Sequence, residues 1–344
     1  MIYLNCDYNE GAHPQVMDAL LMSNMEQSIG YGEDEYCEEA RDMIKGLCKD
    51  YSAYVQFLVG GTQTNKTVID AALRPHQGVL SADTGHINVH ETGAIEACGH
   101  KVLALPSVDG KISADQVEKA YLDHMANGSR EHEVQPKMVY ISNPTEFGTI
   151  YSKDELEDLS RVCKDNGLYL FMDGARLGYG LVCDDNDLDL PTITKCCDVF
   201  YIGGTKVGAL FGEAVVITND AIKEDFRYLI KQNGGMLAKG RLLGLQFKAL
   251  LDDSLYFDIS KHAVLMADAI RRTLNKLGYK YYVESPTNQI FVIMPNKNLE
   301  VLSKNFVLSN ERKYDDDNTV VRICTSWATK QENVSAFIEA LKAL

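Results

Sequence analysis

Short apolar runs alternate with amphipathic stretches along most of the chain. Seven of these runs are predicted strands, at residues 53–58, 78–82, 101–105, 138–141, 168–172, 198–202 and 214–218. Stretches between them have helical spacing, as at 113–121 and 153–166, and Ser152 with Glu155 is typical of a capped helix start. Alternating elements with apolar strands predict an α/β fold, in which helices cover both faces of a mostly parallel seven-stranded sheet.

Both ends of the chain depart from this alternation. A polar arm over residues 1–15 precedes predicted helices at 14–22 and 38–47. Towards the other end, a long helical region from about 237 to 277 leads into predicted strands at 281–284, 290–294 and 320–324 and a last helix at 331–344. We therefore expect a large domain over residues 1–250, arm included, and a small C-terminal α+β domain over 251–344.

The composition narrows the class of protein. With 344 residues the chain is long enough for a sizeable core, and its net charge of −15 leaves no basic surplus to neutralise a nucleic acid or an acidic membrane. Because the sequence has no signal-like leader and no apolar run of about 20 residues, we expect neither secretion nor membrane insertion. Nine cysteines without a CxxC pair are typical of reduced, mostly buried thiols in a cytoplasmic protein.

Two ionisable residues stand directly after predicted strands. Asp173 follows the strand at 168–172, and Lys206 follows an apolar run that ends in Gly203-Gly204-Thr205. A carboxylate and a lysine placed this way suit pyridoxal phosphate, because the acid keeps the pyridine nitrogen protonated and the amine holds the aldehyde as a Schiff base. Arg176 comes three residues after Asp173. Its guanidinium can bind a phenolate or carboxylate oxygen of a ligand, or it can form an ion pair with Asp173.

A glycine-containing turn precedes the first helix of the alternating region. Gly60, Gly61 and Thr62 come between a predicted strand and a helix, where backbone N–H groups can bind a single phosphate. Asn65 stands where a nucleotide-binding loop would need its second glycine, so we favour a single phosphate over a nucleotide, with a plain structural turn as the alternative.

Two further sets of residues are candidates for ligand contacts. His86 and His90 are four positions apart and are followed by Glu91. The uses open to His86 are stacking on a flat cofactor ring, a structural role or metal binding, and of these we favour stacking and predict no metal site. Arg322 lies in an apolar run, where a fixed guanidinium can bind a substrate carboxylate or pair with an acid of the protein.

In this order the motifs resemble the low-specificity threonine aldolases, which belong to the aspartate-aminotransferase-like fold (fold type I) of pyridoxal-phosphate enzymes. The resemblance covers nearly the whole chain, from Asp7 and 31–34 to Arg322, and is most specific at 173–177, 203–206 and 61–65. It implies that Lys206 forms the Schiff base, Asp173 binds the ring nitrogen and His86 stacks on the ring. By the same resemblance, Gly61, Thr62 and Asn65 bind the cofactor, and Arg176 and Arg322 bind the substrate carboxylate.

The resemblance further implies a function. The expected reaction is cleavage of a β-hydroxy-α-amino acid of the threonine or allo-threonine type into glycine and an aldehyde, in a homodimer or homotetramer. We expect His86 to remove the hydroxyl proton, with Glu146 as second choice. The alternative is another pyridoxal-phosphate enzyme acting on amino acids, namely a β-eliminating lyase, an aminotransferase or a racemase. A non-catalytic protein that keeps the fold and a nucleotide-binding protein are the rivals from other classes.

The chain departs from the family at two places. Residues 142–146 read Ser-Asn-Pro-Thr-Glu where these aldolases typically carry a histidine near the substrate hydroxyl. Leu237 stands where an arginine is expected, and Lys239 or Arg241 can serve instead as a phosphate ligand across a subunit boundary. Neither departure changes the cofactor prediction. The prediction of the reaction then depends on His86, Arg322 and the loop around Glu146.

Overall fold

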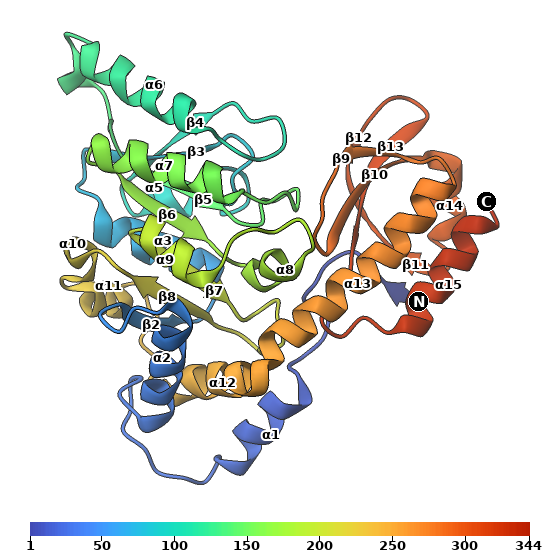
Figure 1. Cartoon of the computed structure of the whole chain (residues 1–344), viewed down its shortest axis with the longest axis horizontal. Coiled ribbons are helices and arrows are strands. Elements are labelled where there is room, and N and C mark those ends of the chain that lie inside the picture. The colour runs from blue at the N-terminus through green and yellow to red at the C-terminus, as the bar shows by residue number, and fades with distance from the viewer.

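A seven-stranded sheet forms the larger part of the fold in the computed structural model, which describes residues 1–344 (Figure 1). The strand order is β2-β8-β7-β6-β5-β3-β4, and only β8 runs antiparallel to its neighbours. The strands are β2 (Tyr54–Leu58), β3 (Gln77–Ala82), β4 (Lys101–Leu105), β5 (Gln135–Ser142), β6 (Tyr169–Asp173), β7 (Val199–Gly203) and β8 (Glu213–Ile217). All seven predicted strands and the mostly parallel sheet are confirmed.

Helices cover both faces of this sheet, because its central strands are apolar on both sides. Along β7, Phe200 and Ile202 belong to one core cluster, whereas Val199 and Tyr201 belong to the cluster on the other face. The first face is covered by α2 (Glu35–Cys48), α6 (Ala114–Ala126), α7 (Lys153–Asp165), α8 (Leu177–Val182), α9 (Leu190–Cys196) and α12 (Arg241–Leu251). The second is covered by α3 (Gly61–Ala72), α4 (His86–Val89), α5 (Ala94–Ala97), α10 (Asp220–Lys223) and α11 (Phe226–Gln232).

A second, antiparallel sheet forms at the C-terminal end of the chain. Its strand order is β12-β13-β10-β9, with β9 (Lys280–Val283), β10 (Gln289–Pro295), β12 (Ser309–Lys313) and β13 (Asn318–Cys324). The helices α14 (Asn296–Leu302) and α15 (Gln331–Lys342) accompany it. The sequence pattern predicted neither β12 nor α14. The strand β12 was missed because it is polar along its length and exposed over nearly all of it. No helix of the chain is both long and apolar enough to span a bilayer.

The long helical region predicted over 237–277 is interrupted. Between α12 and α13 (Leu255–Lys276), a single 3-10 turn at Asp252–Ser254 breaks the helix, because Asp253 and Ser254 have the left-handed φ values of 46° and 63°. Figure 1 shows α13 crossing from the large sheet to the small one. Its first half joins the core of the large sheet and its second half the core of the small sheet. The domain boundary near residue 250 stays a prediction.

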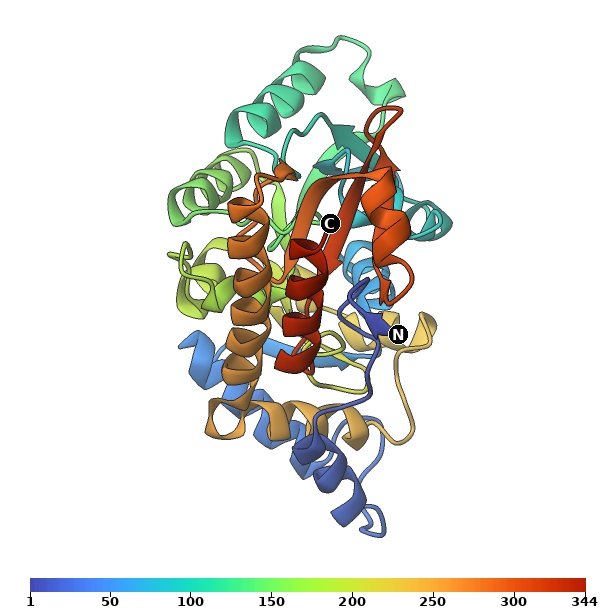
Figure 2. The same ribbon diagram turned by 90° about the vertical axis from the view of Figure 1, so that its right-hand side faces the viewer.

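The N-terminal arm joins the two parts of the fold. Its strand β1 (Ile2–Tyr3) pairs in parallel with β11 (Phe306–Val307), and Figure 2 shows this strand beside the C-terminal part of the chain. The backbone N–H of Cys324 donates to the carbonyl of Leu4, which fixes the arm against β13. The arm then continues to α1 (Pro14–Met22), which lies beside α12 at the bottom of the view in Figure 1.

Candidate active site

Most of the predicted site residues lie at the carboxyl edge of the large sheet, whereas Arg322 lies on the small sheet. Ser142 and Asp173 end the neighbouring strands β5 and β6 and are register partners, and Lys206 follows the next strand, β7. Neighbouring parallel strands deliver their C-terminal residues to one edge, where open α/β sheets bind ligands. The tight packing of the turn after β6 depends on Gly174, where an added Cβ would lie 1.9 Å from the carbonyl oxygen of Tyr201.

Asp173 is a buried carboxylate with three hydrogen-bond donors. Its Oδ2 accepts from the Tyr140 hydroxyl at 2.6 Å and from Asn65 Nδ2 at 3.0 Å, and its Oδ1 accepts from the backbone N–H of Ala175 at 2.9 Å. Burial opposes ionisation, but the positive charge of His86 and the Tyr140 hydrogen bond outweigh it and lower the Asp173 pKa. The carboxylate is therefore negative at neutral pH and can bind a cationic group of a ligand.

His86 is oriented by a buried glutamate that the sequence pattern did not single out for this purpose. Its Nδ1 lies 2.8 Å from Oε1 of Glu91, and the same oxygen accepts from Asn65 Nδ2 at 2.7 Å. Burial lowers the His86 pKa, but the Glu91 hydrogen bond and the charge of Asp173 more than compensate and raise it. Because Glu91 occupies Nδ1, the other ring nitrogen, Nε2, is left for a ligand.

Glu146 lies beside His86. Its Oε1 accepts from the backbone N–H of His86 at 2.9 Å and from the Ser142 hydroxyl at 2.7 Å. Its Oε2 is buried and has no hydrogen-bond partner, and burial raises the pKa of this carboxyl group. A carboxyl group with one unsatisfied buried oxygen can take or give a proton at this position.

Lys206 lies among several charged groups. Burial lowers its pKa, and the nearby positive charge of Arg176 lowers it further. On β8, Glu213 is 3% exposed, accepts from the backbone N–H of Gly204 at 3.2 Å and has a pKa that burial raises to about 8. The lowered pKa increases the share of Lys206 in the neutral amine form, which is the form that reacts with an aldehyde. Nothing in the local sequence marks Glu213, because only the antiparallel pairing of β7 and β8 brings it here.

Arg176 has a partner that neither sequence interpretation gave it. Its Nε and Nη2 bind both oxygens of Asp7, at 2.7 and 3.0 Å, so the ion pair with Asp173 that was the alternative from sequence is absent. Asn288 Nδ2 also donates to Asp7, at 2.9 Å. Burial opposes ionisation of Asp7, yet the charges of Arg176 and Lys206 lower its pKa to about 2. Asp7 belongs to the distant N-terminal arm, so only the tertiary structure reveals this pair.

Arg322 lies on β13, at the side of the site formed by the small sheet. Its Nε is 3.3 Å from Oε1 of Glu311, and its Nη2 donates to the carbonyl of Asn5 at 3.2 Å. The acid partner considered from the sequence is therefore present. Its Nε makes no hydrogen bond of good geometry, although it is buried.

The turn before α3 has the features of an anion site. Gly60 is the N-cap of α3 and offers no side-chain cap, so the first N–H groups of the helix are free of such a partner. An added Cβ at Gly60 would meet no atom within 4 Å, and one at Gly61 would meet only the Tyr201 hydroxyl, at 3.3 Å. That hydroxyl and Thr64 Oγ1 are buried without a hydrogen-bond partner. Asn65, by contrast, is fully buried one turn further along and positions Asp173 and Glu91.

The fold and this site define a class of lyases. The chain belongs to the beta-eliminating lyase family, whose sequence pattern matches residues 6–297. Within that class, its relatives include low-specificity L-threonine aldolases. The enzyme of that name from Pseudomonas sp. (strain NCIMB 10558) is 30% identical over 302 residues, which cover 86% of this chain and 85% of the relative. The resemblance inferred from the motifs is confirmed.

Solved structures agree with this placement. A structure described as threonine aldolase from Leishmania major superposes with a TM-score of 0.97 at 44% identity, over 100% of this chain and 99% of that one. Aspartate aminotransferase from Thermus thermophilus superposes with a TM-score of 0.72 at 15% identity, over 100% and 91% of the two chains, which shows likeness in fold alone. The expected aspartate-aminotransferase-like fold is therefore confirmed.

Proposed function

We propose that this chain is a pyridoxal-phosphate-dependent aldolase that cleaves a β-hydroxy-α-amino acid of the threonine type into glycine and an aldehyde. The proposal rests on two residues that follow or end adjacent strands. Asp173 is buried and ionised, and Lys206 has a lowered pKa. The names of the relatives, low-specificity L-threonine aldolase and threonine aldolase, support the choice of substrate class.

The residues present fit the cofactor. The uncapped start of α3 and the Tyr201 hydroxyl, which has no hydrogen-bond partner, suit a phosphate group. Lys206 suits an aldehyde, and Asp173 suits a protonated ring nitrogen. His86, the first residue of α4, is proposed to stack on the ring. When bound, pyridoxal phosphate supplies an electron sink that accepts the electrons of a bond broken at the α-carbon.

The remaining groups would bind and orient the substrate. We assign its carboxylate to Arg322, whose Nη1 is not engaged by Glu311 or Asn5, with Arg176 as a second contact through the Nη1 that Asp7 does not bind. The neutral form of His86 would take the proton of the β-hydroxyl group at Nε2, while Glu91 holds the ring in place from Nδ1. Glu146 is the second candidate for that proton.

The test is a product assay on the purified full chain supplied with pyridoxal phosphate and threonine, allo-threonine or phenylserine. We expect glycine and the matching aldehyde in equal amounts. Lys206→Ala should abolish both this activity and the visible absorbance of bound cofactor, whereas Lys66→Ala, matched in size and outside the site, should retain both. Release of ammonia and a keto acid in place of glycine would favour β-elimination, the reaction for which the family is named.

The choice of base is tested separately. His86→Gln should lower kcat by a factor of about 10² to 10⁴, the usual contribution of a positioned base. Glu146→Gln should lower it less, since its Oε1 already accepts two hydrogen bonds. The reverse ranking would assign the base to Glu146.

We further propose a homo-oligomer located in the cytoplasm. Around α1 the chain exposes several large apolar side chains, namely Met17, Leu21, Met22, Met25 and Ile29, which are 43% to 89% exposed. Such a group of side chains suits burial against a second copy, which would also bring in Lys239 or Arg241 as the phosphate ligand proposed from sequence. The location is supported by the nine cysteines, all of which are free thiols. Light scattering on the eluting protein tests the oligomer.

A further inference from the structure

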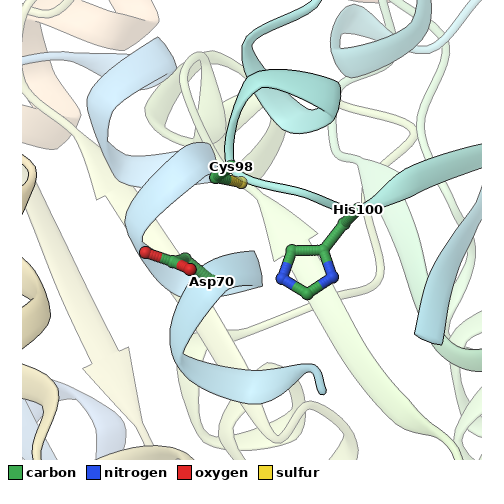
Figure 3. Close-up of side chains that lie close together, drawn as sticks. All are labelled: Asp70, Cys98 and His100. Atoms are coloured by element: carbon green, nitrogen blue, oxygen red, sulfur yellow. The ribbon is translucent and has the colours of Figure 1, made fainter. Parts of the chain in front are cut away.

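Three side chains with metal-binding atoms meet on the face of the large sheet that α3 covers, away from the candidate active site. Asp70 lies in the last turn of α3, and Cys98 and His100 lie in the segment that leads from α5 to β4 (Figure 3). One ligand atom from each side chain lies within 4.8 Å of the other two. Asp70 is nine residues from Gly61, or about 13 Å along the helix axis, so the cluster is at the opposite end of α3 from the proposed phosphate site.

We propose that Asp70, Cys98 and His100 form a binding site for a divalent cation of the zinc type. The donor set combines a thiol, an imidazole and a carboxylate, which together suit zinc. Magnesium and calcium, in contrast, prefer oxygen ligands alone. Three protein ligands leave the fourth tetrahedral position for a water molecule.

Neighbouring groups contact all three ligands, and the Cys98 thiol donates to the backbone carbonyl of Ile95 at 3.1 Å. His100 Nδ1 lies 3.2 Å from the backbone carbonyl of Gln77, and a carbonyl only accepts, so Nδ1 carries the hydrogen. The lone pair of His100 is then on Nε2, the nitrogen left for a metal. Asp70 Oδ2 accepts from Asn233 Nδ2 at 3.1 Å, which holds that carboxylate and leaves its Oδ1 uncommitted. A partner of this kind behind each ligand is typical of protein metal sites.

Cys98 differs from the other eight cysteines, all of which are buried, because it alone is partly exposed. Burial, and to a lesser degree the charge of Asp70, raise the pKa of its thiol to about 11, so the metal-free site holds a thiol. The other charges that act on this thiol are those of Lys66 on α3 and Glu96 on α5. When a cation binds, the S–H bond breaks, the proton passes to the buffer and a sulfur–metal bond forms.

The distances between the three ligand atoms need only a small change to fit a zinc ion. With bonds of about 2.0 to 2.3 Å in a tetrahedron, two zinc ligands lie roughly 3.3 to 3.8 Å apart. Rotation of the partly exposed Asp70 or Cys98 side chain can shorten the larger separations to this range, while buried His100 stays in place. The bound cation would tie the end of α3 to the start of β4, and it would stabilise the folded chain in proportion to its affinity.

The experiment is a titration of the purified full chain, freed of metal by a chelator, with Zn²⁺ in competition with a chromogenic chelator. We expect one tight site per chain, with Kd below about 10 μM and a melting temperature that rises on saturation. Cys98→Ser should weaken binding at least tenfold and abolish the rise, and Asp70→Ala should weaken it as well. His76→Gln, an exposed histidine near the same end of the sheet, is the matched control and should bind as the wild type does.

Co²⁺ gives a second readout that does not depend on stability. A thiolate–cobalt charge-transfer band should appear with the wild-type chain and be missing with Cys98→Ser. Absence of a saturable site, or equal affinity in wild type and Cys98→Ser, would overturn the proposal. Because no aldolase substrate or pyridoxal phosphate is needed, the outcome is independent of the proposed function.

Discussion

Replacement of Asp7 by asparagine tests whether the N-terminal arm is fixed by a buried ion pair. Asp7→Asn keeps the size and polarity of the side chain but leaves the Arg176 guanidinium without its charged partner. The folded-state pKa of about 2 against an ordinary 3.8 corresponds to about 2 kcal/mol at neutral pH. Removing one member of a buried pair costs about 3 to 5 kcal/mol in other proteins, so we expect a loss of about 2 to 4 kcal/mol.

The expected loss converts to a shift in melting temperature. At about 2.1 cal/mol/K per residue, a chain of 344 residues has an unfolding entropy of about 0.7 kcal/mol/K. Asp7→Asn should therefore melt about 3 to 6 °C below the wild type in differential scanning calorimetry at pH 7. Asp18→Asn, an exposed residue of α1, is the control and should stay within about 1 °C.

The pH dependence of the melting temperature tests the same ion pair. The Asp7 pKa is lower in the folded chain, so its stabilisation is complete above about pH 4 and is lost as the pH falls towards 2. The difference in melting temperature between wild type and Asp7→Asn should thus narrow below pH 4. The reasoning is refuted if the two melt together at pH 7, or if the double change Asp7→Asn with Arg176→Met shows no coupling between the two sites.

Three further predictions concern substitutions of single residues. Glu91→Gln removes the charge that raises the His86 pKa, so the acid limb of the kcat profile should move to lower pH; an unmoved limb would remove His86 from the role of base. Gly174→Ala places a Cβ 1.9 Å from the Tyr201 carbonyl oxygen, and it should reduce stability by at least about 1 to 3 kcal/mol, measured by urea unfolding. Leu21→Asp places a charge on the exposed apolar side of α1 and should shift the light-scattering mass towards the monomer, with an unchanged mass counting against an interface there.

The sequence by itself determined the frame of the active site. Apolar runs on both faces of a sheet and helices between them have a local signature, because burial and periodicity are properties of a few neighbouring residues. Asp173 and Lys206 could be placed near each other for the same reason, since the residues that follow adjacent parallel strands meet at one edge. The turn at Gly60 and Gly61 carried its own signal as well.

The tertiary structure alone decided how the charges are paired. Arg176 binds Asp7 of the distant N-terminal arm, and Glu91 accepts a hydrogen bond from Asn65 of α3. Both contacts depend on where separate segments of the chain pack. The position of Glu213 near Lys206 depends on an antiparallel strand that no sequence spacing reveals. Polarity tells which residues need a partner when they are buried, but the identity of the partner is set by the packing of the whole chain.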